Sequence, residues 1–203
     1  MAARITRTLC GLKIRTMEKK LASHSKFLSL ILRHSPETIG IELDSSGWTD
    51  IDELIRRADA SGRRLDHDTL LRVVHQNDKQ RFAINTDGTR IRANQGHSVN
   101  VDLKLVATEP PEHLFHGTVE KFIDSIKEKG LISGERQHVH LSSDIETARI
   151  VARRRGTPVI LLVRALEMTE SGSEFYLSSN GVWLTDHVLT KFIDFPQTSG
   201  NAT

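Results

Sequence analysis

The chain has 203 residues, of which 37% are hydrophobic and 27% are charged, a balance typical of one or two globular domains. Its single cysteine excludes a framework of intrachain disulfides. No apolar run approaches the length that spans a bilayer, so we expect a protein of the cytoplasm without a membrane partner.

The net charge of +2 hides an asymmetry between the two halves of the chain. Residues 1–100 contain 17 Lys and Arg against 12 Asp and Glu, whereas residues 101–203 contain 11 against 14. The basic first half favours an anionic partner, of which nucleic acid is one candidate. Residues 1–17 are basic and contain no acid, and we expect them to form a disordered extension.

The first half predicts three helices followed by a β-hairpin. Pro36 ends the first helix, Thr49 and Asp66 are the expected N-caps of the other two, and Asp87-Gly88 forms the turn of the hairpin. The expected elements are helices over 21–34, from 49 to 62 and from 66 through 74, and strands over 80–85 and 90–93. This order is that of a winged-helix module, which we assign to residues 18–107.

The second half predicts an α+β fold with a mainly antiparallel sheet, because two helices come early and a group of strands comes late. The stretch TEPPEH at 108–113 is expected to be a linker. We assign the second lobe to residues 112–197 and a loose tail to 198–203. The expected elements are strands over 114–117, 138–142, 159–163, 174–177, 182–185 and 191–195, and helices over 119–129 and 144–155.

The stretch RQHVHLS, residues 136–142, contains two histidines with strand spacing. In a strand, His138 and His140 face one side, while Val139 and Leu141 face the other. A zinc site is disfavoured, since Cys10 is the only thiol and no HExxH or CxxC pair is present. The spacing leaves two interpretations open, histidines that bind a ligand and histidines that hydrogen-bond within the core.

Four groups of residues have the chemistry of a functional site. Each also has an ordinary explanation, such as a cation at a helix C-terminus or a histidine satisfied in the core. The glycine of one group would let a ligand approach the backbone closely. Arg153, Arg154 and Arg155 are interpreted as the solvated end of a helix. The four groups are Arg33 with His34; Arg81; His116 with Gly117 and Thr118; and Arg136 with His138, His140 and Ser142.

Seven motifs, SKFLSLILRHSP, DSSGWTDIDELI, NDKQRFAI, QGHS, LFHGT, GLISGERQHVHLS and NGVWLTD, occur in this order. With them the chain resembles the RNA 2′-phosphotransferase family, known as KptA in bacteria, over about residues 21–195. The resemblance implies a winged-helix lobe and an ADP-ribosyltransferase-like lobe. It also implies removal of an internal 2′-phosphate from RNA with NAD⁺ as acceptor. The implied products are 2′-OH RNA, nicotinamide and ADP-ribose 1″,2″-cyclic phosphate.

The resemblance also implies roles for single residues. The family's catalytic set falls on four residues, all of the family's types: Arg33, His34, Arg81 and Arg136. Three signature positions of the NAD⁺ cleft fall on His116, His140 and Val182. Gly117, Thr118 and Ser142 are further expected NAD-binding residues. Many related ADP-ribosyltransferases have a glutamate where this chain has Val182, and family members often have a proline where this chain reads HVLTKFI. The expected partners are a 2′-phosphorylated RNA and NAD, which is consumed as co-substrate. We expect a monomer that needs no metal.

Two other functions remain as alternatives. The chain could be an ADP-ribosyltransferase that caps phosphorylated RNA ends or proteins and stops after the first chemical step. It could instead be a nucleic-acid-binding regulator whose second lobe senses NAD⁺ without turnover. The presence of all four catalytic residue types argues against the regulator.

Overall fold

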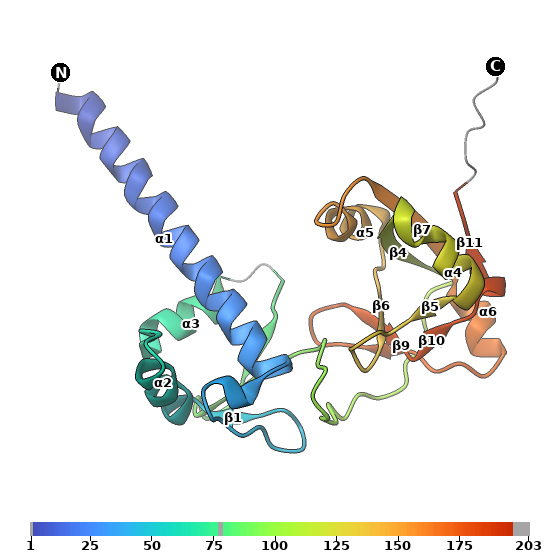
Figure 1. Ribbon diagram of the computed structural model, residues 1–203, viewed down its shortest axis with the longest axis horizontal. Helices are drawn as coiled ribbons and strands as arrows, with labels where there is room; N and C mark the ends of the chain where they lie inside the picture. Colours follow the sequence, from blue (N-terminus) through green and yellow to red (C-terminus); the bar gives the residue numbers. More distant parts are fainter. Residues whose placement is uncertain (1, 77–78, 197–203) are drawn as a thin grey trace. The chain divides into compact units, whose positions relative to one another are not determined.

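The structure is a computed structural model that describes residues 2–76 and 79–196, with only the backbone described for residues 2–16. It divides into two compact units, Met1–Leu103 and Lys104–Thr203, whose elements are drawn in Figure 1. Both units combine helices with antiparallel strand pairs, which confirms the α+β class. The assignment of the units to a winged helix and an ADP-ribosyltransferase-like lobe stays a prediction. Among the described residues, no helix is long and apolar enough to cross a membrane.

The first unit packs three helices against a small antiparallel sheet with the strand order β1-β3-β2. The C-terminal part of the first helix contributes an apolar face to the core, and its buried hydrophobic residues are Phe27, Leu28, Ile31 and Leu32. The elements are α1 (Ala2–Arg33), η1 (Pro36–Thr38), β1 (Thr49–Asp50), α2 (Ile51–Ala60), α3 (His67–His75), β2 (Phe82–Ile84) and β3 (Arg90–Ala93).

The helix ends of the first unit agree with the sequence in part. The carboxylate of Asp66 accepts the backbone N–H of Thr69 at 2.7 Å, which confirms this N-cap. The expected cap at Thr49 is wrong, because Thr49 pairs with β3 and the next residue, Asp50, caps α2. The first helix begins at Ala2, whereas composition favoured a disordered extension over residues 1–17.

The second unit contains three groups of strands, in the orders β11-β7-β4, β6-β9-β8 and β10-β5. The elements are β4 (His113–Val119), η2 (Glu120–Phe122), α4 (Ile123–Lys129), β5 (Leu131–Ile132), β6 (Val139–Leu141), α5 (Ile145–Ala152), β7 (Pro158–Arg164), α6 (Ala165–Glu170), β8 (Tyr176–Leu177), β9 (Trp183–Thr185), β10 (His187–Val188), η3 (Thr190–Phe192) and β11 (Ile193–Asp194).

Several elements of the second unit differ from the expectation. The helix expected over 144–155 ends at Ala152, so the three following arginines lie beyond it. The segments α6, β5 and β10 were not expected. In the expected linker, Thr108 donates its N–H to the carbonyl of Phe175 at 2.8 Å, so this residue is tied to the second unit. The expected tail at 198–203 lies outside the described residues.

The packing of α5 on β4 requires a glycine at position 117. A Cβ atom on Gly117 would lie 2.0 Å from the carbonyl oxygen of Ala148 and 3.1 Å from the Cβ of Ala152. The first distance is far below a van der Waals contact, and the obstacle is helix backbone rather than a flexible side chain. The close approach at Gly117 is therefore that of a helix, which is a different reason from the ligand approach that the sequence suggested.

Gly117→Ala should lower the stability of the protein by about 2 kcal/mol or more, because the added methyl forces α5 away from β4. The matched control is Gly62→Ala, at φ +81° with open space around the site. It should cost only about 1–2 kcal/mol for the left-handed backbone. Urea unfolding midpoints of both variants measure the difference. A loss at Gly117 no larger than that at Gly62 would contradict the packing argument.

His97 is a buried polar residue in the first unit. Its side chain is 1% exposed, and neither ring nitrogen has a hydrogen-bond partner among the described residues. Burial, followed by the positive charges of Arg33, His34 and Arg92, lowers the pKa of His97 from 6.5 to about 4. The folded protein therefore holds this ring neutral at neutral pH.

Between pH 6.5 and pH 4 the unfolded chain should bind a proton at His97 that the folded chain does not bind. This contribution to stability is complete above pH 6.5 and falls as the pH is lowered, by about 2 kcal/mol at pH 5. His97→Gln should remove this part of the pH dependence, measured as the change in urea midpoint between pH 7 and pH 5. If parent and variant lose the same stability over this interval, His97 is not the group responsible.

Candidate functional site

Arg33 and His34 lie at the C-terminal end of α1, where partial negative charge on the helix favours cations. The side chain of Arg33 is only 8% exposed. Its Nη2 donates to the carbonyl oxygen of Arg81 at 3.3 Å, and its guanidinium lies 6.0 Å from the ring centroid of Phe82. This hydrogen bond ties Arg81, which directly precedes β2, to the end of α1.

His34 is exposed beside this buried arginine. Its Nδ1 lies 3.0 Å from the hydroxyl oxygen of Ser98. The backbone N–H groups of Ser98 and Val99 donate to the carbonyl oxygen of Arg33 at 2.9 and 3.2 Å. The last residue of the QGHS motif and the residue after it therefore satisfy the carbonyl at the end of α1, and Ser98 contacts the imidazole of His34.

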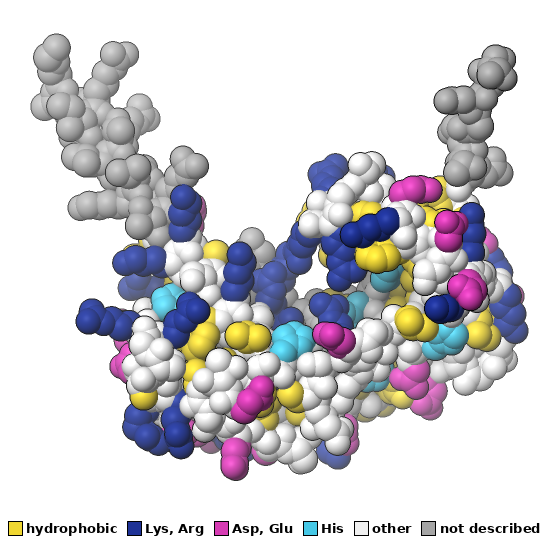
Figure 2. All heavy atoms as spheres, in the orientation of Figure 1, with side chains coloured by type: hydrophobic (Ala, Val, Ile, Leu, Met, Phe, Trp, Pro, Cys, Tyr) yellow, Lys and Arg dark blue, Asp and Glu magenta, His cyan; other side chains and the backbone are white. Residues whose placement is uncertain are grey.

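Arg81 is held in place through its backbone. Its carbonyl oxygen also accepts the N–H of Asn94 at 2.9 Å, and the amide group of Asn94 donates to the carbonyl of Gln80 at 2.5 Å. We call Arg33, His34 and Arg81 the arginine cluster. Figure 2 shows Lys and Arg side chains spread over the visible face of the first unit, as expected for a partner with negative charge.

In the second unit, β4 and the end of β6 are joined by a reciprocal pair of backbone hydrogen bonds. Phe115 and Ser142 exchange their N–H and carbonyl groups at 2.9 and 2.8 Å. This pairing brings His116 of β4 next to β6, where its Nδ1 lies 3.1 Å from the carbonyl oxygen of His140. A carbonyl oxygen only accepts, so Nδ1 of His116 carries the proton and Nε2 of the neutral ring is an acceptor.

The pKa of His116 lies below its usual value of 6.5. Burial is the largest cause, the positive charge of Arg155 adds to it, and the hydrogen bond to His140 opposes it. The neutral form of His116 is therefore favoured near pH 7. The neutral ring of His116 would therefore offer its acceptor nitrogen, Nε2, to a ligand.

Arg136 precedes β6 and donates its Nη1 to Nδ1 of His140 at 2.6 Å. Because arginine only donates, Nδ1 of His140 accepts, and the proton of a neutral ring lies on Nε2. The Arg136 side chain is exposed overall. Nevertheless, partial burial and then the charge of Arg155 lower its pKa, although an arginine keeps its charge at any physiological pH. We call Arg136, His116 and His140 the histidine cluster.

The remaining expected residues differ in their access. Val182 directly precedes β9, whose register with β6 puts Val182 at the level of Ser142, and its backbone pairs with Ser178 at 3.0 Å. Thr118 is buried, with 5% of its side chain exposed. Gly117 faces α5 on the side where a Cβ would project. This packing gives Gly117 a structural role, and contact of Gly117 and Thr118 with NAD stays a prediction.

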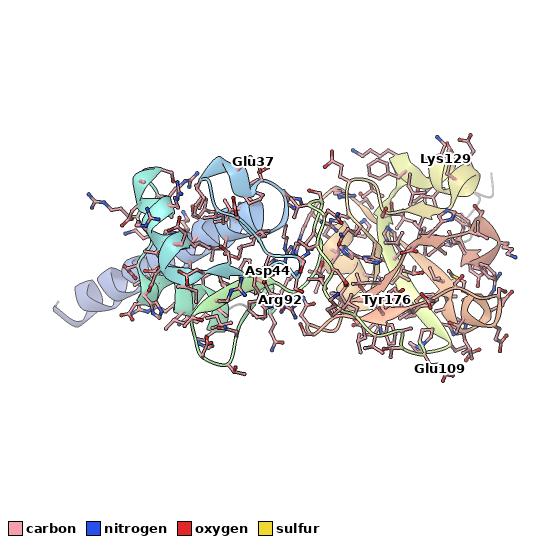
Figure 3. All side chains as sticks on the ribbon, turned by 90° about the horizontal axis from the view of Figure 1, so that it is seen from below. Glu37, Asp44, Arg92, Glu109, Lys129 and Tyr176 are labelled. Atoms are coloured by element: carbon pink, nitrogen blue, oxygen red, sulfur yellow. The ribbon has the colours of Figure 1, made fainter. Side chains whose placement is uncertain are left out.

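His138 makes a different set of contacts from His140. Its ring meets that of Tyr176, labelled in Figure 3, edge-on at 5.7 Å between centroids, and its Nε2 lies 3.6 Å from Asp186. The choice of His140 as the signature position stays a prediction. The contacts favour it, because His140 alone of the two touches both His116 and Arg136.

Two residues near these clusters were not expected from the sequence. Arg155 acts on both His116 and Arg136 through its charge, although its run of arginines was interpreted as solvated. Ser98 contacts His34, and its only signal in the sequence was its place in the QGHS motif. The four catalytic residues expected from the resemblance divide into three in the first unit and one in the second.

No group of three or more His, Cys, Asp or Glu side chains suited to hold a metal ion occurs in the part of the chain that the structure describes. The two clusters consist of arginine and histidine. Arginine cannot act as a metal ligand at neutral pH, because it keeps its proton. The arginines of the clusters therefore suit anions, and the histidines can exchange hydrogen bonds with hydroxyl groups.

Comparison with known proteins identifies the chain's relatives. Residues 19–187 match the RNA 2′-phosphotransferase, Tpt1 / KptA family. A probable RNA 2′-phosphotransferase of Flavobacterium johnsoniae is 58% identical over 173 residues, which are 85% of this chain and 95% of the relative. Proteins of the same description from Hahella chejuensis and Pseudomonas fluorescens are 50% and 54% identical, over 90% and 87% of this chain and 98% and 97% of theirs. The chain belongs to the RNA 2′-phosphotransferase family.

Proposed function

We propose that this chain transfers an internal 2′-phosphate of RNA to NAD⁺. The products would be 2′-OH RNA, nicotinamide and ADP-ribose 1″,2″-cyclic phosphate. Membership of the family supports the RNA 2′-phosphate as the substrate, and the resemblance of the motifs supplies NAD⁺ as the acceptor. The observation that carries the proposal is the nearly buried Arg33, whose guanidinium donates to the backbone of Arg81 and whose neighbour in the sequence is His34.

The arginine cluster suits a phosphomonoester. This group carries close to two negative charges at neutral pH, and its oxygens accept hydrogen bonds from several directions. The planar fork of an arginine binds two such oxygens at once and keeps its charge. Burial of the Arg33 guanidinium weakens the competition from water, so an anion bound there gains more than at an exposed arginine.

The histidine cluster suits the ribose and amide groups of a dinucleotide. Nε2 of His116 is an acceptor, while Nε2 of a neutral His140 carries a proton, so the two rings offer one acceptor and one donor. A ribose hydroxyl can donate to the first ring and accept from the second. In the proposed function these contacts orient NAD⁺, while Arg136 contributes a positive charge next to His140.

The proposed reaction has two steps. In the first, an oxygen of the RNA 2′-phosphate attacks C1″ of the NAD⁺ ribose and displaces nicotinamide. In the second, the ribose 2″-hydroxyl attacks phosphorus, and the RNA 2′-oxygen leaves and gains a proton. Negative charge grows on the phosphoryl oxygens in the second step, where positioned cations stabilise most. Arg33, Arg81 and Arg136 are the residues proposed to supply that charge.

Val182 fits this chemistry at the position where many related transferases have a glutamate. A neutral hydroxyl acceptor gains from a carboxylate that activates it or orients the ribose. A phosphate is already ionised near neutral pH and needs no such base. A carboxylate at this position would also repel the phosphate, so an apolar residue is compatible with an anionic nucleophile.

An assay with 2′-phosphorylated RNA, NAD⁺ and purified protein tests the proposed function. The 2′-phosphate should disappear while nicotinamide and ADP-ribose cyclic phosphate form in equal amounts. The reaction should proceed in EDTA, since arginines rather than a divalent ion neutralise the phosphate. Chromatography of all three products measures the outcome. RNA that emerges unchanged at saturating NAD⁺ would overturn the proposal, and a stable ADP-ribosylated RNA would show a transferase that stops after the first step.

Arg136→Ala should slow the second step more than the first, so that ADP-ribosylated RNA accumulates. The loss of one positioned charge from the transferred phosphate is worth roughly a hundredfold in rate. Arg136→Lys should restore part of the rate, because lysine returns the charge without the fork. Single-turnover time courses that follow RNA, intermediate and product separate the two steps.

Arg154→Ala is the control for Arg136. Arg154 is an exposed arginine of the same unit, in the turn beyond α5, and should change the rate little. If Arg136→Ala turns over at nearly the parent rate without intermediate, Arg136 has no catalytic role. If both variants lose the same activity, the effect belongs to the general positive charge of the unit.

A further inference from the structure

The hydroxyl of Ser98 has two partners at the end of α1. Its oxygen lies 3.0 Å from Nδ1 of His34 and 3.4 Å from the carbonyl oxygen of Arg33. Both distances permit a hydrogen bond, but a hydroxyl has one proton to donate and can accept as well. Which partner receives that proton decides where the proton of His34 lies.

The carbonyl oxygen of Arg33 already has two donors. The backbone N–H groups of Ser98 and Val99 reach it at 2.9 and 3.2 Å, which occupies both of its lone pairs. A third donor at 3.4 Å adds little, whereas Nδ1 of a neutral His34 is closer and accepts. A hydroxyl proton placed in the shorter of the two contacts points to His34, and the proton of the neutral ring then lies on Nε2.

Protonation of His34 leaves the outer nitrogen unchanged. A protonated ring donates from Nδ1, and the Ser98 oxygen can accept that bond while its hydroxyl turns to the carbonyl of Arg33. Nε2 carries a proton in both states. Its ring edge is consequently a hydrogen-bond donor whatever the charge of His34.

The segment that carries Ser98 is held by its neighbour in the sequence and by its backbone. His97, which precedes Ser98, is buried in the first unit, while Ser98 itself is exposed beside His34. The two N–H bonds to the carbonyl of Arg33 set the distance between this segment and α1. These backbone bonds do not depend on the Ser98 side chain.

We propose that Ser98 is a positioning residue, whose hydroxyl holds His34 as a hydrogen-bond donor from Nε2 to an oxygen of the RNA 2′-phosphate. This inference rests on the proposed function for the identity of the anion. It assigns His34 the role of a donor to phosphate rather than that of a base that removes a proton. A phosphate oxygen only accepts, so a donor in every state of the ring matches it.

NMR spectroscopy of the full chain tests the tautomer of His34 without substrate. The ¹⁵N shifts of the imidazole are recorded above the pH at which the ring titrates, and the signals are assigned with His34→Gln. The parent should show the proton on Nε2. Ser98→Ala should show a mixture of tautomers, and Ser98→Thr, which keeps a hydroxyl, should restore the parent pattern. A proton on Nδ1 in the parent would overturn the proposal.

Single-turnover rates with 2′-phosphorylated RNA and NAD⁺ provide the second measurement. Ser98→Ala should lose about threefold to tenfold in rate, since an exposed neutral hydrogen bond is involved, and Ser98→Thr should recover most of it. The control is Ser35→Ala, because Ser35 follows His34 directly and its side chain caps no helix. It should leave both tautomer and rate unchanged.

The two measurements separate this inference from the proposed function. If the parent protein is inactive on RNA but shows the expected tautomers, the hydrogen bond from Ser98 to His34 is supported. The RNA 2′-phosphate is then not the ligand that His34 binds. An active parent whose tautomer and rate are both unchanged by Ser98→Ala overturns the positioning role and leaves the function intact. Circular dichroism of each variant excludes unfolding as the cause of a loss.

Discussion

The burial of a positive charge at the end of α1 is the constraint on which the first unit depends. An arginine residue that is only 8% exposed loses most of its hydration, and this loss costs several kcal/mol unless polar groups replace the water. The negative end of a helix and the carbonyl of Arg81 supply part of that replacement. Segments far apart in the sequence must therefore meet around Arg33, and their meeting brings His34, Arg81 and Ser98 together.

The second unit depends on close packing between backbones rather than on a buried charge. Gly117 allows α5 to lie directly on β4, and the backbone pair of Phe115 with Ser142 attaches the end of β6 to an edge of that strand. The same arrangement sets the polarity of the histidine cluster. Nδ1 of His116 must donate to a carbonyl oxygen, and Nδ1 of His140 must accept from Arg136. These hydrogen bonds fix the tautomer of each neutral ring.

Sequence patterns among neighbouring residues predicted much of this fold. They failed where a feature depends on contacts between residues far apart in the sequence. Asp66 was identified correctly as a cap from its residue type and its place before the helical pattern, whereas the neighbours Thr49 and Asp50 are both good caps. A strand partner 42 residues away, Ile91 opposite Thr49, decides between them. The residues of both clusters came from family motifs, but the burial of Arg33 and the influence of Arg155 on His116 depend on long-range packing that periodicity does not contain.

Arg164 and Arg136 have partners that differ in charge. Arg164 donates to the carboxylates of Glu167 and Asp194 and to the carbonyl of Lys191, so its charge is balanced within the fold and joins three elements. Arg136 donates to an imidazole nitrogen, a partner that uses one of its five N–H groups and balances none of its charge. Stability alone would favour a carboxylate at that place, as at Arg164. A neutral partner orients the guanidinium while leaving its charge available, which is the property that an anion-binding arginine needs.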